Sequence, residues 1–246
     1  MQPLIPFLLV LGRVSAFFAV LPVWSFKGVP VAIRAALALM ASVLFASLVP
    51  APADLAVGHP LAAALLLVRE VLCGLALGLA VALVFAAIQQ TGEIVQIQMG
   101  LADAEIIDPL SGQDSQPMGM LLEMAFFMLF LAAGGHHLLL SLIGRSYVAF
   151  PIGAVPPPDV MADAVLQAGA LMLVFGLKLA APLLAGFLLL AVVLAVLARA
   201  LPELNVLMAS LPIRVGLGFI LAAALVPSLG AFTQEMGEWL NQFLTV

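Results

Sequence analysis

The sequence predicts an all-α integral membrane protein with about six long, kinked hydrophobic helices arranged as helical hairpins. Of its 246 residues, 65% are hydrophobic and 9% are charged, whereas roughly a quarter of the residues in soluble domains are charged. A soluble globule of this size would have more surface than 8 basic and 13 acidic residues can keep hydrated. The apolar runs are long and show no alternation with period two, which favours helices over membrane strands.

Six apolar segments follow one another, and each break between them contains Pro or Gly, which end helices. Residues 164–198 would form a helix of roughly 50 Å, whereas the hydrocarbon core of a bilayer is about 30 Å thick. Pro182 predicts a kink near the middle of that helix. We therefore expect some helices to tilt, kink or extend beyond the bilayer. The segments are residues 3–23, 31–50, 61–88, 118–143, 164–198 and 205–233.

A polar stretch separates the third segment from the fourth. Residues 88–119 contain five acidic residues and neither Lys nor Arg. Helical periodicity over residues 89–103 separates an apolar face from a polar face, which we expect to line a pore or a polar interface. The apolar face carries Ile94, Ile97 and Leu101, and the polar face carries Gln89, Glu93, Gln96, Gly100 and Asp103.

Residues 104–117 are predicted to form a loop, because Asp108-Pro109, Ser111-Gly112 and Gln116-Pro117 all stop a helix. Two interpretations of this loop stay open. It either connects two helices at the membrane surface, or lines or blocks a pore. In the second alternative the loop can lie within the membrane, because irregular backbone is tolerated there if protein or a water-filled cavity surrounds it.

Among the ionisable residues within apolar segments, four are candidates for a functional role: Arg13, Glu70, Glu123 and Lys178. Each costs a few kcal/mol at bilayer depth unless it is paired or faces water. Glu70 follows Arg69 near the start of a segment, so snorkelling to the interface can account for both. For Arg13, Glu123 and Lys178 the alternatives are polar contacts between helices or subunits, and a transport pathway.

The sequence contains no motif that supports catalysis, and we expect neither enzyme activity nor a cofactor nor a metal site. His136 and His137 are adjacent, so on a helix they point about 100° apart and cannot chelate one ion together. An HExxH motif, a phosphate-cradling Gly loop with Lys and a Ser–His–acid arrangement are all missing. The formal net charge is −5, whereas proteins that bind nucleic acid typically carry a basic surface, so we expect no binding of nucleic acid.

Five stretches become specific for one family when they are taken together. They are GRVSAFFAVLPVW, VPVAIRAALAL, REVLCGLALGLAVALVFAAIQQTGEIVQIQMGLADAEIIDP, FLAAGGHHLLLSLI and ARALPELNVLMASLPIRVGLG. Through them the chain resembles the FliR family of type III secretion export apparatus subunits over nearly its whole length. The over-length helices are compatible with that family, whose subunits assemble into a helical cone that lies largely outside the membrane.

The resemblance implies a single-copy subunit of the flagellar export gate in the bacterial inner membrane, within the basal body. Its implied partners are FliP, FliQ, FlhB and FlhA, with unfolded export substrates in transit and no nucleic acid. Residues 1–160 would correspond to a FliP-like helical region, and residues 161–246 to a FliQ-like helical hairpin. The alternatives are the equivalent subunit of a virulence-type injectisome and a small-solute or proton-coupled transporter that uses Arg13, Glu123 and Lys178.

The resemblance also implies a loop that projects into the central pore and plugs the closed gate. In this reading the helix over residues 89–103 lines the interior of the assembly. By position, the plug corresponds to Ile106, Ile107, Asp108, Pro109, Leu110, Ser111, Gly112 and Gln113.

Overall fold

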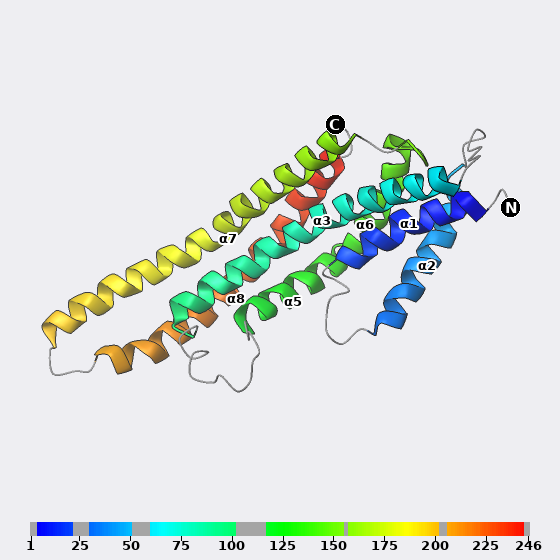
Figure 1. Ribbon diagram of the computed structural model, residues 1–246. Coiled ribbons are helices and arrows are strands. Elements are labelled where there is room, and N and C mark those ends of the chain that lie inside the picture. The colour runs from blue at the N-terminus through cyan, green and yellow to red at the C-terminus, as the bar shows by residue number, and fades with distance from the viewer. Residues whose placement is uncertain are drawn as a thin grey trace. The chain divides into compact units, whose positions relative to one another are not determined.

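The computed structural model describes residues 4–21, 30–50, 60–101, 117–154, 157–201 and 206–243, which form helices and no strand (Figure 1). The predicted all-α fold is therefore confirmed. Within the described residues, four spans are long and apolar enough to cross a membrane, namely Val31–Leu48, Pro60–Met99, Asp159–Ala200 and Ser210–Glu235, and the bent pair Met118–Ala132 and Gly135–Ala149 can count as a fifth. The seven helices of the described ranges are α1 (Leu4–Val20), α2 (Val31–Leu48), α3 (Pro60–Met99), α5 (Pro117–Ala132), α6 (Gly135–Ala149), α7 (Pro158–Ala200) and α8 (Val206–Phe243).

The predicted segment 118–143 is divided into α5 and α6, so the described ranges contain one helix more than the expected six. The two helices are separated by a short break at residues 133 and 134. Gly134 lies in this break with a φ of +79°. Glycine adopts this left-handed conformation without the steric penalty of a Cβ atom, so it allows the chain to turn there.

Three helices are longer than a bilayer requires, including the one that the sequence predicts over residues 164–198. α3 has 40 residues and continues without a break through the first part of the polar stretch. α7 has 43 residues, with Pro182 inside it, and α8 has 38 residues, with Pro212 and Pro227 inside it. At 1.5 Å per residue, α7 is about 65 Å long, roughly twice the thickness of the hydrocarbon core.

The chain forms two compact units, of which the first combines Met1–Val84, Gly134–Ala170 and Glu235–Val246. In this unit α1 and the first part of α3 run parallel, because Arg13 meets Gly74 and Phe17 meets Gly78, four residues further along both helices. A Cβ atom at Gly74 would collide with the carbonyl oxygen of Arg13. The two helices therefore approach each other closely at this glycine.

The second unit combines Phe85–Ala133 with Leu171–Gln234, and buried aromatic rings form its core. Phe85 of α3 contacts Phe126 of α5, and their ring centroids are 5.0 Å apart. Phe232 of α8 joins Phe126, at 5.6 Å, to Phe175 of α7, at 5.1 Å. Edge-to-face and tilted rings at these distances stabilise a core beyond the area that they bury.

The described parts of α7 and α8 in this second unit form an antiparallel hairpin. Phe175 packs on Phe232, and Gly186 packs on Leu221. Higher residue numbers on α7 therefore pair with lower residue numbers on α8. This arrangement agrees with the helical hairpins that the sequence predicts.

Replacement of Gly74 by Ala should destabilise the first unit by about 1–3 kcal/mol, because the added methyl group meets backbone that cannot rotate away. Gly169→Ala is the matched control, since nothing lies within 4 Å of a Cβ atom built there. The midpoint of thermal unfolding of the purified chain in detergent measures both effects. Equal midpoints for the two variants would contradict the close approach of α1 and α3.

Candidate functional site

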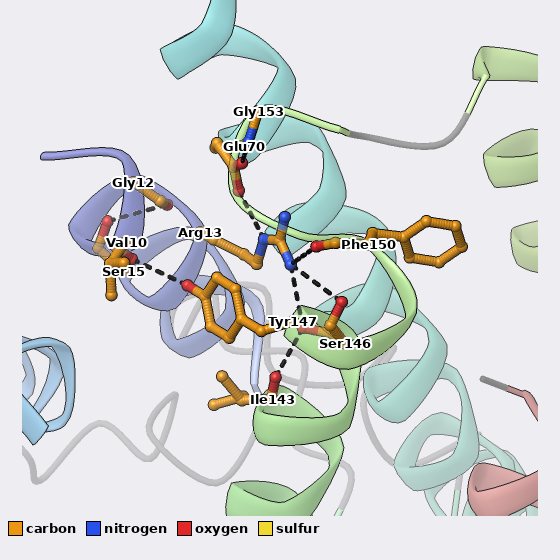
Figure 2. A network of polar contacts seen from close by, with 10 residues as sticks. All are labelled: Val10, Gly12, Arg13, Ser15, Glu70, Ile143, Ser146, Tyr147, Phe150 and Gly153. Atoms are coloured by element: carbon orange, nitrogen blue, oxygen red, sulfur yellow. Dashed lines mark hydrogen bonds and ion pairs between the residues drawn. The ribbon is translucent and has the colours of Figure 1, made fainter. Parts of the chain in front are cut away.

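A buried polar cluster lies among the helices of the first unit (Figure 2). We call it the Arg13 cluster, and its centre is an ion pair in which Arg13 Nε of α1 donates a hydrogen bond of 2.6 Å to Glu70 Oε2 of α3. Only 1% of the Arg13 side chain and 0% of the Glu70 side chain is exposed. The other members, from α6 and the turn that follows it, are Ser146, Tyr147, Phe150 and Gly153.

The guanidinium group of Arg13 is bound chiefly by the end of α6. Its Nη1 donates to the carbonyl oxygen of Ser146 at 3.2 Å, to Ser146 Oγ at 3.3 Å and to the carbonyl oxygen of Phe150 at 3.0 Å. The Tyr147 ring lies 4.2 Å from Arg13 Cζ, a distance at which the ring face attracts a cation. The Tyr147 hydroxyl in turn donates to the carbonyl oxygen of Val10 at 3.4 Å. Both Arg13 and Val10 thus connect α1 to α6.

Glu70 connects the same ion pair to the turn that leads from α6 towards α7. Its second oxygen, Oε1, accepts a hydrogen bond of 2.9 Å from the backbone N–H of Gly153. Gly153 has a φ of +87°, which glycine adopts readily and other residues do not. The cluster therefore ties together α1, α3, α6 and residues 150–153.

The geometry identifies the Arg13 cluster as a cross-link between helices. Opposite charges in direct contact offset much of the cost of removing each charge from water, and the additional hydrogen bonds satisfy Arg13 Nη1 and Glu70 Oε1. Arg13 Nη2 is buried without a hydrogen-bond partner among the described residues. For Arg13 the structure therefore supports the predicted polar contact between helices. A transport pathway needs groups that a solute can reach, and these two side chains are almost completely covered.

The interpretation of Glu70 as a snorkelling residue is wrong. Its carboxylate points into the first unit, towards Arg13, whereas its neighbour Arg69 is exposed. The two residues of the ion pair are 57 positions apart and lie on different helices. Helical periodicity predicts contacts only within one helix, so it could not predict this pair. One feature of the sequence could have predicted the pair. A cation and an anion occur in two different apolar segments, and burial of either charge without the other costs free energy.

The other predicted polar and charged site residues of the described ranges do not belong to the Arg13 cluster. Lys178 is exposed on α7, with its Nζ 5.7 Å from the ring centroid of Phe175. Glu123 is partly buried on α5, Gln89 is exposed on α3, and Glu93 is partly exposed one turn further on. A role of these residues in lining a pore stays a prediction.

Gln96 is buried, which contradicts its expected place on a wet face of the helix. It is 4% exposed, and its Oε1 accepts a hydrogen bond of 3.3 Å from the backbone N–H of Met118. Ile97, expected on the apolar face, is 60% exposed. The reason is that α5 crosses α3 at Gly92 and covers the face on which Gln96 lies, one turn later.

Asp103 and the predicted plug lie outside the described residues. Residues 102–116 are not described, and they include the predicted plug residues Ile106, Ile107, Asp108, Pro109, Leu110, Ser111, Gly112 and Gln113. Their roles therefore stay predictions.

Side chains that commonly bind metals do not gather anywhere in the described ranges. No three or more His, Cys, Asp or Glu residues of those ranges form a group that could hold a metal ion. The rings of His136 and His137 lie 4.2 Å apart in the first turn of α6, and Cys73 is buried on α3.

Glu70→Ala should lower the free energy of unfolding by about 3–5 kcal/mol, since it leaves the Arg13 cation buried without its counter-charge. Arg69→Ala, one position away on the exposed side, is the control and should have little effect. Thermal unfolding of the purified chain measures both. Combining Arg13→Met with Glu70→Met should recover part of the loss, because no unpaired charge remains; a double variant less stable than Glu70→Ala would contradict this account.

Known proteins match nearly the whole chain. The profile of the family described as bacterial export proteins, family 1, matches residues 4–238. The flagellar biosynthetic protein FliR of Escherichia coli (strain K12) is 34% identical over 224 residues, covering 91% of this chain and 85% of the relative. FliR of Bacillus subtilis (strain 168) is 31% identical, covering 87% and 83%. The Yop proteins translocation protein T of Yersinia pestis is 31% identical, covering 64% and 61%. The chain therefore belongs to family 1 of the bacterial export proteins.

Proposed function

We propose that this chain is a subunit of the flagellar type III protein export gate in the bacterial inner membrane. The observation that carries the proposal is the family match over residues 4–238, together with relatives named flagellar biosynthetic proteins that cover most of the chain. The translocation protein T of Yersinia pestis covers a smaller share. This difference favours a flagellar over a virulence-type apparatus.

Assembly with FliP-like, FliQ-like, FlhB-like and FlhA-like proteins is part of this proposal. The length of α7 supports it, because a helix of about 65 Å cannot be covered by a hydrocarbon core of about 30 Å alone. Apolar side chains are nevertheless exposed near both ends of α7 and between them. Protein surfaces are the natural cover for the part that exceeds the bilayer. These side chains are Val160, Leu166, Leu173, Val174, Leu177, Leu188, Leu189, Val192, Val193 and Val196.

The Arg13 cluster argues against the alternative of a self-sufficient transporter. Arg13 was one of three residues that such a transporter would use, and it is committed to Glu70 and to the end of α6. Secondary transporters typically bind substrate at discontinuous helices in paired halves of the chain. The gate subunit is therefore the proposed function.

Closure of the gate is assigned in this proposal to residues 106–113, which would project into the pore of the assembly. Gln89 is exposed and Glu93 is partly exposed on α3, the helix that precedes this segment. Both side chains are polar, which supports a pore with a polar lining near that helix. The absence of Lys and Arg from residues 70–144 gives the whole region a single sign of charge.

The assembly is tested by co-expression of the tagged chain with its FliP-like, FliQ-like and FlhB-like partners, followed by measurement of the intact mass of the purified complex. One copy of the tagged chain within a much larger assembly is the expected result. A monomer or homo-oligomer that is stable alone and does not bind these partners would overturn the proposal.

Replacement of residues 106–113 by a Gly/Ser segment of equal length should raise the leak of ions and small solutes through membranes that contain the complex. The physical reason is that a flexible polar segment cannot fill a pore as a packed plug does. Solute uptake by cells that express the complex measures the leak, and replacement of Gln98 by Met on α3 is the control. Unchanged permeability in complexes of normal mass would contradict the plug while leaving the subunit assignment intact.

A further inference from the structure

We infer that Gln96 is a positioning residue that holds the end of α3 to the beginning of α5. Two different groups of this residue make the contact. Its backbone carbonyl oxygen takes part in ending α3, and its side-chain oxygen binds the first turn of α5. Gln96 thereby fixes both flanks of residues 102–116 at one point.

The end of α3 is formed by a defined backbone motif. Gly100 has a φ of +76°, and its N–H donates to the carbonyl oxygen of Ile97 at 3.0 Å. The N–H of Leu101 donates to the carbonyl oxygen of Gln96 at 3.2 Å. These two hydrogen bonds around a left-handed glycine are a Schellman motif, which satisfies the last carbonyl groups of a helix and ends it at a fixed residue.

The beginning of α5 depends on an acceptor from α3. The first N–H groups of a helix have no partner within that helix, and Pro117, the first residue of α5, has no N–H at all. No acidic residue lies in the first turn of α5. Gln96 Oε1 accepts from the N–H of Met118 at 3.3 Å, so it serves as an N-cap supplied by another helix.

A close approach of the two helices brings Gln96 within reach. A Cβ atom at Gly92 would collide with Gly119 Cα, so the backbones of α3 and α5 nearly touch there. Gln96 follows Gly92 by one helical turn and lies on the same face. The surroundings of the contact are dry, because Val95, Met99 and Met118 are buried. An unsatisfied N–H costs more there than in water.

The functional meaning of this contact rests on the proposed plug at residues 106–113. Leu101, before the segment, and Met118, after it, both donate backbone hydrogen bonds to Gln96. Gln96 would then set the position of the plug without being part of it. The physical contact itself stands independently of that role.

The test compares three variants within the intact, co-expressed complex. Gln96→Met keeps the length of the side chain but lacks the amide oxygen. Gln96→Glu keeps an oxygen at the same reach and places its charge at a helix N-terminus, where anions are favoured. Gln98→Met is the control, because Gln98 lies on the same helix and is partly exposed.

Hydrogen–deuterium exchange at the amides of Met118 and Gly119 reports the contact directly. Gln96→Met should speed exchange there by about fivefold, the size expected from the loss of one helix N-cap, and Gln96→Glu should restore slow exchange. Unchanged exchange in Gln96→Met, or fast exchange in both Gln96 variants, would overturn the inference. Gln98→Met should leave exchange at these amides as it is in the unmodified chain.

Solute leak separates this inference from the proposed function. If replacement of residues 106–113 raises leak, Gln96→Met should raise it too and Gln96→Glu should not. Leak in the plug variant without leak in Gln96→Met would overturn the positioning role. No leak in the plug variant, combined with faster amide exchange in Gln96→Met, would contradict the proposed plug but confirm the contact.

Discussion

The ion pair between Arg13 and Glu70 is the interaction on which the first compact unit depends. Neither charge is tolerable alone in a covered, apolar environment, so each fixes the position of the other. Arg13 also binds the carbonyl groups at the end of α6, and Glu70 binds the turn that follows. One pair of side chains thereby determines the relative placement of α1, α3 and α6 within this unit.

Glycine and a polar residue one turn away act together in both units. In the first, Gly74 allows α1 to touch α3, and Glu70, one turn earlier on α3, pairs with Arg13 of α1. In the second, Gly92 meets Gly119, and Gln96, one turn later, binds the N–H of Met118. Close backbone approach brings helices within reach of short polar contacts, and those contacts fix the register that packing of apolar surfaces alone leaves loose.

Long helices with exposed apolar faces link this fold to a role in a larger assembly. α7 and α8 form a hairpin in the second unit, yet large apolar side chains such as Leu188 and Val193 remain uncovered. Lipid can cover only the length of helix that lies within the bilayer. The remainder suits contact with neighbouring subunits, in agreement with the membership of this chain in a family of export proteins.

The sequence by itself determined the fold class, the approximate helices and the family. Hydropathy and the positions of Pro and Gly are local properties, and they located α1 and α2 closely and most of α3, α7 and α8. The division of residues 118–143 at Gly134 was not predicted, because the chain is apolar on both sides of it. Tertiary structure alone decided which charges meet and which polar residues are covered. Glu70 was assigned to the interface and Gln96 to a wet face, because periodicity identifies the faces of a helix but not the helix that packs on each. Arg13 and Glu70 are distant in sequence, and only the close approach of α1 and α3 at Gly74 brings them together.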